Sequence, residues 1–186
     1  MAGCERGGDK GMFQAKRIEG VAKPAFYRDL SRQLSGLLDG ERDAVANAAN
    51  MAALMFHAMP DLNWAGFYFL RADLPGGGAG LVVGPFQGQP ACVRIPVGRG
   101  VCGSAVERRQ SILVEDVHAF PGHIACDAAS RSELVVPLAA GGTILGVLDL
   151  DSPLPARFDA DDQAGVEQLA AIFMAACDFG QSFARV

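Results

Sequence analysis

Residues 133–152, "ELVVPLAAGGTILGVLDLDS", contain the clearest structural signal in the chain. Two runs of strand-forming residues are separated there by Gly141 and Gly142. A Gly-Gly pair supplies the positive φ angles that a tight hairpin turn requires, so the stretch predicts two antiparallel strands. Its apolar runs have the length of strands and are interrupted by Pro, Gly or Asp, which argues against a membrane-spanning helix.

Working outward from this hairpin, the chain alternates between strand and helix patterns. A helix is predicted from Pro24 to Gly40, because apolar residues recur there every three or four positions. Further helices are expected over 41–58, 101–109 and 159–179, further strands over 63–71, 81–86, 91–97 and 111–116, and a loop with at most one helical turn over 117–131. Most neighbouring strands can pair antiparallel. The pattern therefore predicts an α+β fold, a single antiparallel sheet of about six strands covered by helices.

In the second of these helices, 41–58, we expect Val45, Ala49, Ala52, Ala53 and Phe56 to be available to one buried face.

Length and composition restrict the class of protein. The 186 residues suggest one domain over 21–180, preceded by a flexible, glycine-rich tail over 1–20 that lacks the apolar segment of a secretory signal. A cytoplasmic location with reduced cysteines is the default, and the odd number of five cysteines argues against a simple disulfide scaffold. The net charge of −5 offers nucleic acid no general attraction, and we expect no association with nucleic acid or membrane.

Three of the five cysteines lie in stretches rich in turn residues. Cys126 has the strongest functional case, because it lies in the polar loop "GHIACDAAS". Cys102 begins a short helix, where the helix N-terminus can lower a thiol pKa, and Cys92 begins a predicted strand, where burial alone is an equal explanation. Cys4 and Cys177 are expected to be a tail thiol and a core residue.

A zinc site is the weaker interpretation of the same residues. Cys92, Cys102 and Cys126 could be joined by His118 and His123, which together supply enough ligands. Their spacing lacks the CxxC and HxxxH patterns that mark zinc sites. We therefore expect neither a metal nor an organic cofactor.

Acidic and aromatic residues supply a second group of candidates. Asp149 and Asp151 are two positions apart and face the same side of a strand, and Glu133 on the neighbouring strand could join them. Clustered carboxylates raise one another's pKa and could bind an ammonium group or donate a proton. Trp64 and Tyr68 also share one face, with a glycine between them that leaves space for a small apolar pocket. A solvated strand end and ordinary core aromatics are the structural alternatives.

Four strings together resemble a known enzyme family, the free methionine-(R)-sulfoxide reductases, which are single-domain enzymes of the GAF fold. The strings are "NWAGFYFL" (63–70), "GPFQGQPACVRIPVGRGVCG" (84–103), "EDVHAFPGHIACDAASRSELVVPL" (115–138) and "GVLDLDSPLPARF" (146–158). The resemblance covers about residues 22–175, and many GAF domains lack this set of cysteines. The N-terminal tail and a long "DLPGGGAG" loop are the departures.

The resemblance implies a thiol reaction. The Cys126 thiolate attacks the sulfur of free methionine (R)-sulfoxide and becomes a sulfenic acid, which condenses with a second thiol to a disulfide that thioredoxin reduces. Cys92 is the first choice for the second thiol, with Cys102 as the alternative or as a relay.

The resemblance also assigns roles to the pocket residues. Trp64 would contact the methyl group of the substrate and Tyr68 would shape the pocket, whereas Glu133, Asp149 and Asp151 would bind the ammonium and assist protonation of the sulfoxide oxygen. A homodimer is implied as well. The competing interpretation is a non-catalytic GAF sensor of a small ligand or of redox state, because a fold alone does not define a function.

Overall fold

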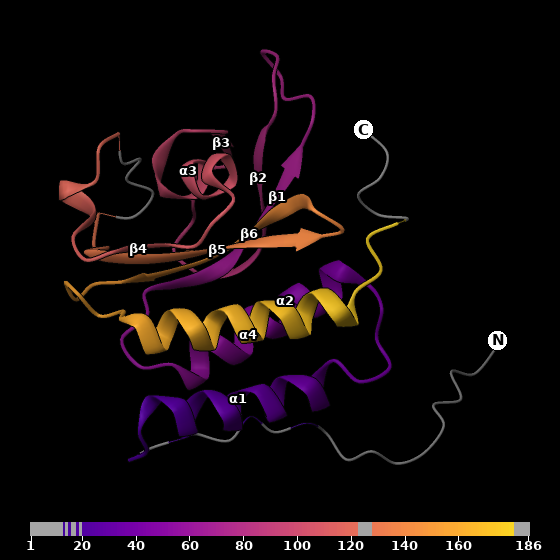
Figure 1. Cartoon of the computed structure of the whole chain (residues 1–186), viewed down its shortest axis with the longest axis vertical. Coiled ribbons are helices and arrows are strands. Elements are labelled where there is room, and N and C mark those ends of the chain that lie inside the picture. The colour runs from indigo at the N-terminus through magenta and orange to yellow at the C-terminus, as the bar shows by residue number, and fades with distance from the viewer. Residues whose placement is uncertain (1–12, 14, 16–17, 19, 123–127, 181–186) are drawn as a thin grey trace.

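The computed structural model describes residues 13, 15, 18, 20–122 and 128–180, and its centre is one antiparallel sheet. Six strands lie in the order β3-β2-β1-β6-β5-β4, with antiparallel pairing throughout (Figure 1). The predicted α+β class and strand number are confirmed. The strands are β1 (Trp64–Arg71), β2 (Gly80–Gly88), β3 (Arg94–Pro96), β4 (Ile112–Val114), β5 (Ser132–Ala140) and β6 (Thr143–Ser152).

The β5–β6 hairpin forms where the sequence predicts it. Gly141 and Gly142 have φ angles of 55° and 80°, a conformation that L side chains adopt only under strain. Strand β6 then pairs on its other side with β1. This connection joins the C-terminal hairpin to the N-terminal strands and makes β1 and β6 the centre of the sheet.

Helices cover the two faces of the sheet unequally. Helices α2 (Ala44–Ala58) and α4 (Ala160–Ala176) lie on one face, and α1 (Lys23–Leu37) packs beneath them, whereas α3 (Gly100–Arg108) lies on the other face (Figure 1). The apolar core is correspondingly split into two clusters. The cluster on the α3 side contains the aromatic residues predicted to line a pocket.

Helix α2 forms, but its buried face differs from the prediction. Ala52 is buried and Phe56 packs against the core, as predicted, but Val45 is 48 % exposed, and Asn47 and Met51 are fully buried instead. Asn47 is not among the residues predicted for this face. Its amide donates to the Glu41 carbonyl and to Cys177 Sγ. The helix begins after Asp43, whose carboxylate accepts hydrogen bonds from the first backbone amides, so the helix starts later than residue 41.

A buried ionic cluster fastens α1 to α4. Asp162, in the first turn of α4, has a side chain that is 2 % exposed and is paired with Lys23 and Arg157. Tyr27 donates to its Oδ1 at 2.7 Å. Burial and the adjacent carboxylate raise the pKa of Tyr27 well above its ordinary range, so this phenol remains a donor.

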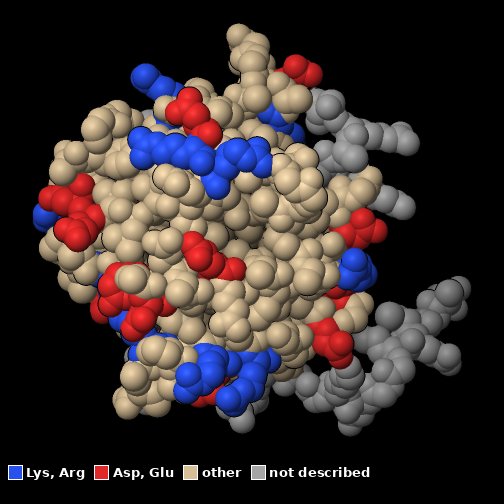
Figure 2. Space-filling model, in the orientation of Figure 1, with Lys and Arg blue, Asp and Glu red and all other residues tan. Residues whose placement is uncertain are grey.

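Charged residues are dispersed over the surface. Figure 2 shows acidic and basic side chains in small groups over the face in view, with apolar and uncharged surface between them. Among the described residues, the helices are too short or too polar to cross a bilayer.

Candidate active site

Strand register gathers the predicted site residues on the α3 side of the sheet. Trp64 on β1 lies opposite Asp151 on β6, and Asp151 lies opposite Glu133 on β5. One step along the same face, Asp149 lies opposite Gly66. Side chains of residues two apart on a strand point to the same side, so these pairings bring the aromatic and the acidic candidates together.

Trp64 is held in place from several directions. Its ring stacks with Tyr68 and with Phe86, at centroid distances of 5.7 and 5.2 Å, and its Nε1 donates to the Gln89 carbonyl at 3.2 Å. A Cβ on Gly66 would lie 2.7 Å from the Trp64 ring, so the indole occupies the space that this glycine leaves, and the space is not open for a pocket. The indole therefore has little freedom to change orientation.

A small pocket opens between these aromatic residues and the acidic strand end. Asp149 is 6 % exposed and its Oδ1 has no hydrogen-bond partner among the described residues. A buried polar atom of this kind needs a partner, and a ligand can supply it. The pocket is lined by Trp64, Tyr68, Gln89, Pro90, Ala91, Asp149 and Asp151.

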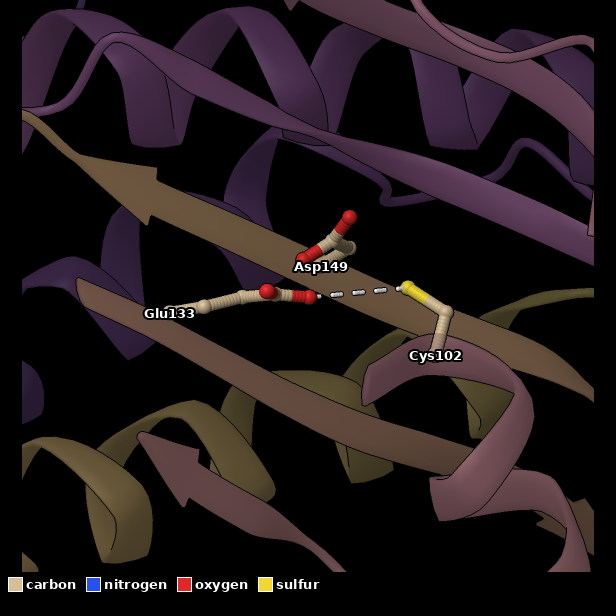
Figure 3. Close-up of side chains that lie close together, drawn as sticks. All are labelled: Cys102, Glu133 and Asp149. Carbon is tan, nitrogen blue, oxygen red and sulfur yellow. Dashed lines mark hydrogen bonds between the residues drawn. The ribbon is translucent and has the colours of Figure 1, made fainter. Parts of the chain in front are cut away.

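One thiol and two carboxyl groups meet beside this pocket. Cys102 from α3 donates a hydrogen bond to Glu133 Oε1 from β5, at 3.9 Å, and Asp149 from β6 completes the group (Figure 3). One ligand atom from each of the three lies within 4.8 Å of the others, and all three residues are buried. The sequence predicted the two carboxylates as partners but not this place for Cys102.

Burial raises the pKa of all three groups. The pKa of Cys102 is raised well above its ordinary value by burial and by the neighbouring Asp149 and Glu133. Burial and the neighbouring Asp149 and Asp151 raise the pKa of Glu133, and burial raises the pKa of Asp149 to about 7. The expectation that the helix N-terminus lowers the Cys102 pKa is therefore wrong, because desolvation and negative neighbours outweigh the helix dipole.

Cys92 lies in a different environment. It is half-buried and precedes β3, which begins at Arg94, so the expectation that it begins a strand is wrong. It directly follows Ala91, which lines the pocket. Cys177 ends α4 inside the core, as expected.

The proposed nucleophile Cys126 lies outside the described residues, as do His123 and Cys4. The described residues on either side of this segment lie near the site. Val117, in the 3₁₀ turn Val117–Ala119, donates from its amide to the Arg131 carbonyl at 2.8 Å, two residues before Glu133. Asn63 also donates to Ser130 Oγ at 3.0 Å.

The set of cysteines and histidines suggested as a zinc site is not brought together in the described part of the chain. Within residues 20–122 and 128–180, Cys102 meets Glu133 and Asp149, and neither Cys92 nor His118 joins the group.

Two contributors to the site were missed from the sequence. Phe86 stacks on Trp64, and Gln89 accepts its indole hydrogen bond. The string "GPFQGQP" contains both, but only the β1–β2 register places Phe86 opposite Gly66. A backbone acceptor such as the Gln89 carbonyl has no signature in sequence.

The fold and the pocket define a GAF domain: residues 46–178 match the GAF domain family. A free methionine-R-sulfoxide reductase from Escherichia coli (strain K12) is 51 % identical over 167 residues, which are 88 % of this chain and 98 % of that protein. The chain belongs to the free methionine-R-sulfoxide reductase family and is an oxidoreductase.

Solved structures agree in fold. The X-ray structure of the free methionine-R-sulfoxide reductase from Neisseria meningitidis, in complex with its substrate, has a TM-score of 0.81 at 42 % identity and covers 89 % of this chain and 95 % of its own. A candidate GAF sensor protein from Burkholderia vietnamiensis has a TM-score of 0.79 at 54 % identity, covering 84 % of this chain and 96 % of its own. The predicted GAF fold is confirmed.

Proposed function

We propose that this protein reduces free methionine (R)-sulfoxide to methionine at the pocket between Trp64 and Asp149. The observation that carries the proposal is the buried, unpartnered Asp149 Oδ1 beside a fixed indole. An ammonium group supplies the missing partner, and the indole offers an apolar surface for the substrate methyl group. The 51 % identity to a named reductase supports the same substrate.

The acidic cluster fits two tasks in this reaction. Asp151 and Asp149 line the pocket and can accept hydrogen bonds from the substrate ammonium. Burial raises the pKa of Glu133, which favours its protonated form, and this carboxyl group can deliver a proton toward the sulfoxide oxygen. Protonation of that oxygen makes it easier to break its bond to the substrate sulfur.

Cys126 is the proposed nucleophile. Its thiolate bonds to the sulfoxide sulfur. The protonated oxygen then passes to the cysteine sulfur as the sulfur–sulfur bond and the substrate's sulfur–oxygen bond break, so methionine leaves and the cysteine becomes a sulfenic acid. The substrate sulfur is reduced by two electrons and the cysteine sulfur is oxidised by two. A second thiol then displaces the oxygen as water and forms a disulfide.

Cys92 is the better second thiol. It is half-buried and adjoins the pocket wall at Ala91, so it can meet an exchange partner. Cys102 is fully buried against two carboxyl groups that oppose its ionisation. Because thiolates rather than thiols carry out exchange, Cys102 is the slower candidate.

The remaining parts of the proposal concern the surroundings of the enzyme. Thioredoxin would reduce the disulfide, the reducing cytoplasm would keep the resting thiols free, and two chains would form a homodimer. Sedimentation of the reduced protein tests the dimer directly.

The substrate proposal is tested by comparing free methionine (R)-sulfoxide with its N-acetylated, C-amidated analogue at equal concentration. We expect turnover of the free amino acid only, since a lost charge-assisted hydrogen bond costs about 1.5–3 kcal/mol. Equal rates on both compounds would show that Asp149 and Asp151 do not recognise the ammonium. Binding of the free sulfoxide without any methionine formed would favour the sensor interpretation.

The thiol roles are tested in single turnovers without thioredoxin. Cys126→Ser should release no methionine. Cys92→Ser should release one equivalent of methionine in this assay. When thioredoxin is then supplied, Cys92→Ser should release no more methionine, whereas Cys102→Ser should turn over repeatedly. Cycling in Cys92→Ser together with arrest in Cys102→Ser would exchange the two roles.

A further inference from the structure

The cluster of Cys102, Glu133 and Asp149 combines one soft sulfur with two hard oxygens. This donor set suits Zn²⁺ and its relatives, whereas Mg²⁺ and Ca²⁺ prefer oxygen alone. We propose that the cluster binds a thiophilic divalent cation such as Zn²⁺ and that the bound ion inhibits the protein. The ion here is an inhibitor from solution and plays no part in the reaction proposed above.

The distances between the donor atoms fit a small cation. In a tetrahedral zinc site with zinc–sulfur and zinc–oxygen bonds of about 2.3 and 2.1 Å, sulfur and oxygen are about 3.6 Å apart. Cys102 Sγ and Glu133 Oε1 are 3.9 Å apart. One oxygen of the Asp149 carboxylate lies within 4.8 Å of both. Side-chain rotations that move the donor atoms by a few tenths of an ångström to about one ångström would therefore bring all three within bonding distance of one ion.

A second observation is independent of the clustering. Asp149 is 6 % exposed and its Oδ1 has no hydrogen-bond partner among the described residues. Because Asp149 also lines the pocket with Asp151, an ion can reach the cluster from the pocket. The fourth coordination position would remain for water or for Asp151, since three protein ligands leave one tetrahedral position open.

The chemistry of ion binding follows from the protons that the cluster holds. The Cys102 thiol must lose its proton to become a ligand, and the carboxyl groups must release theirs. A divalent charge replaces these protons in a buried site that contains three negative ligands. The ion then occupies the carboxylates that the proposed function assigns to the substrate ammonium, so inhibition rests on that function, whereas binding does not.

The binding test uses Cd²⁺ alone as the probe, because cadmium–thiolate bonds absorb in the ultraviolet. The full chain is prepared with Cys102 as its only cysteine by replacing the other four with serine, which are Cys4, Cys92, Cys126 and Cys177. We expect the absorption band to saturate at one Cd²⁺ per chain. Asp149→Asn and Glu133→Gln in the same background should each weaken binding at least tenfold, and the matched control Asp73→Asn, in the exposed β1–β2 loop, should not.

A second measurement keeps the proposal testable if the serine background does not fold. The wild-type chain and the single variant Cys102→Ala compete with a chromophoric chelator for Zn²⁺. Loss of one tight zinc equivalent in Cys102→Ala supports the site. An unchanged zinc stoichiometry, a missing cadmium band, or equal affinity in Asp149→Asn overturns it.

Inhibition is measured separately from binding. Methionine release in a single turnover without thioredoxin should fall at least tenfold with one equivalent of Zn²⁺, and excess free methionine sulfoxide should slow zinc binding. Full activity in the zinc-loaded protein would show that the bound ion does not inhibit the protein, but it would not contradict zinc binding at the cluster. Cadmium binding by the chain that keeps only Cys102, together with no methionine release by the metal-free wild-type chain, would leave the site intact and refute the proposed function instead.

Discussion

Replacing Asp149 by asparagine should stabilise the protein at alkaline pH while it impairs the site. Burial raises the Asp149 pKa from its ordinary 3.8 to about 7 in the folded chain. Asparagine has nearly the same shape as a protonated aspartic acid, but it never becomes charged. The variant therefore removes the penalty of ionising a buried carboxyl group without leaving a cavity.

The direction of the pH effect follows from proton linkage. Below pH 3.8 both the folded and the unfolded chain hold the Asp149 proton, so ionisation costs nothing. Between pH 3.8 and about 7 the unfolded chain releases the proton and the folded chain keeps it, so the free energy of unfolding falls as pH rises. Above pH 7 the loss is complete.

The size of the effect follows from the same two pKa values. At about 1.4 kcal/mol per pH unit, a rise from 3.8 to about 7 corresponds to roughly 4 kcal/mol. Because the ionisation of Asp149 is coupled to that of Cys102 and Glu133, we expect the variant to regain only about half of this free energy of unfolding, or about 2 kcal/mol. The same variant should lose activity, since the substrate ammonium loses its charged partner.

Urea unfolding followed by circular dichroism at pH 5 and pH 8 measures this prediction. The free energy of unfolding of Asp149→Asn should match that of the wild type within about 1 kcal/mol at pH 5 and exceed it by about 2 kcal/mol at pH 8. The exposed control Asp73→Asn should differ little at either pH. A difference that is the same at both pH values, or a less stable variant at pH 8, would refute the argument that Asp149 is a buried acid with a raised pKa.

Two further predictions concern packing and the ionic cluster. Gly66→Ala places a Cβ 2.3 Å from the Phe86 Cβ and should lower the free energy of unfolding, measured in urea, by about 1–3 kcal/mol. The control Gly36→Ala, whose Cβ would have no atom within 4 Å, should not destabilise the protein. Equal effects of the two variants would contradict the close packing at Gly66. Asp162→Ala removes the carboxylate that pairs with the largely buried Arg157 and accepts a hydrogen bond from Tyr27, so it should cost about 3 kcal/mol even though Lys23 keeps its pair with Asp159. Asp29→Ala removes an exposed pair and should cost less than about 1 kcal/mol, so comparable losses would show that the Asp162 cluster is not structural.

Local patterns in the chain were sufficient to predict the element order and the hairpin. Gly141 and Gly142 fix a turn through their own φ preferences, and Pro24 with the apolar period after it fixes a helix. These signals act over a few residues, so they can be read without knowing the rest of the fold. The candidate carboxylates and the aromatic pair were found in the same way, from their spacing on single strands.

The environment of each site residue depended on contacts between distant parts of the chain. The register that places Trp64 opposite Asp151 pairs β1 with β6, and no local pattern specifies that pairing. Only the pairing of Glu133 with Asp151 lies within the predicted hairpin. Cys102 has the helix N-terminus that the sequence predicted, yet its thiol pKa rises because the fold buries it against two carboxyl groups. Desolvation and charge proximity are properties of the packed molecule, so the chemistry of this thiol was decided only when α3 docked on the sheet.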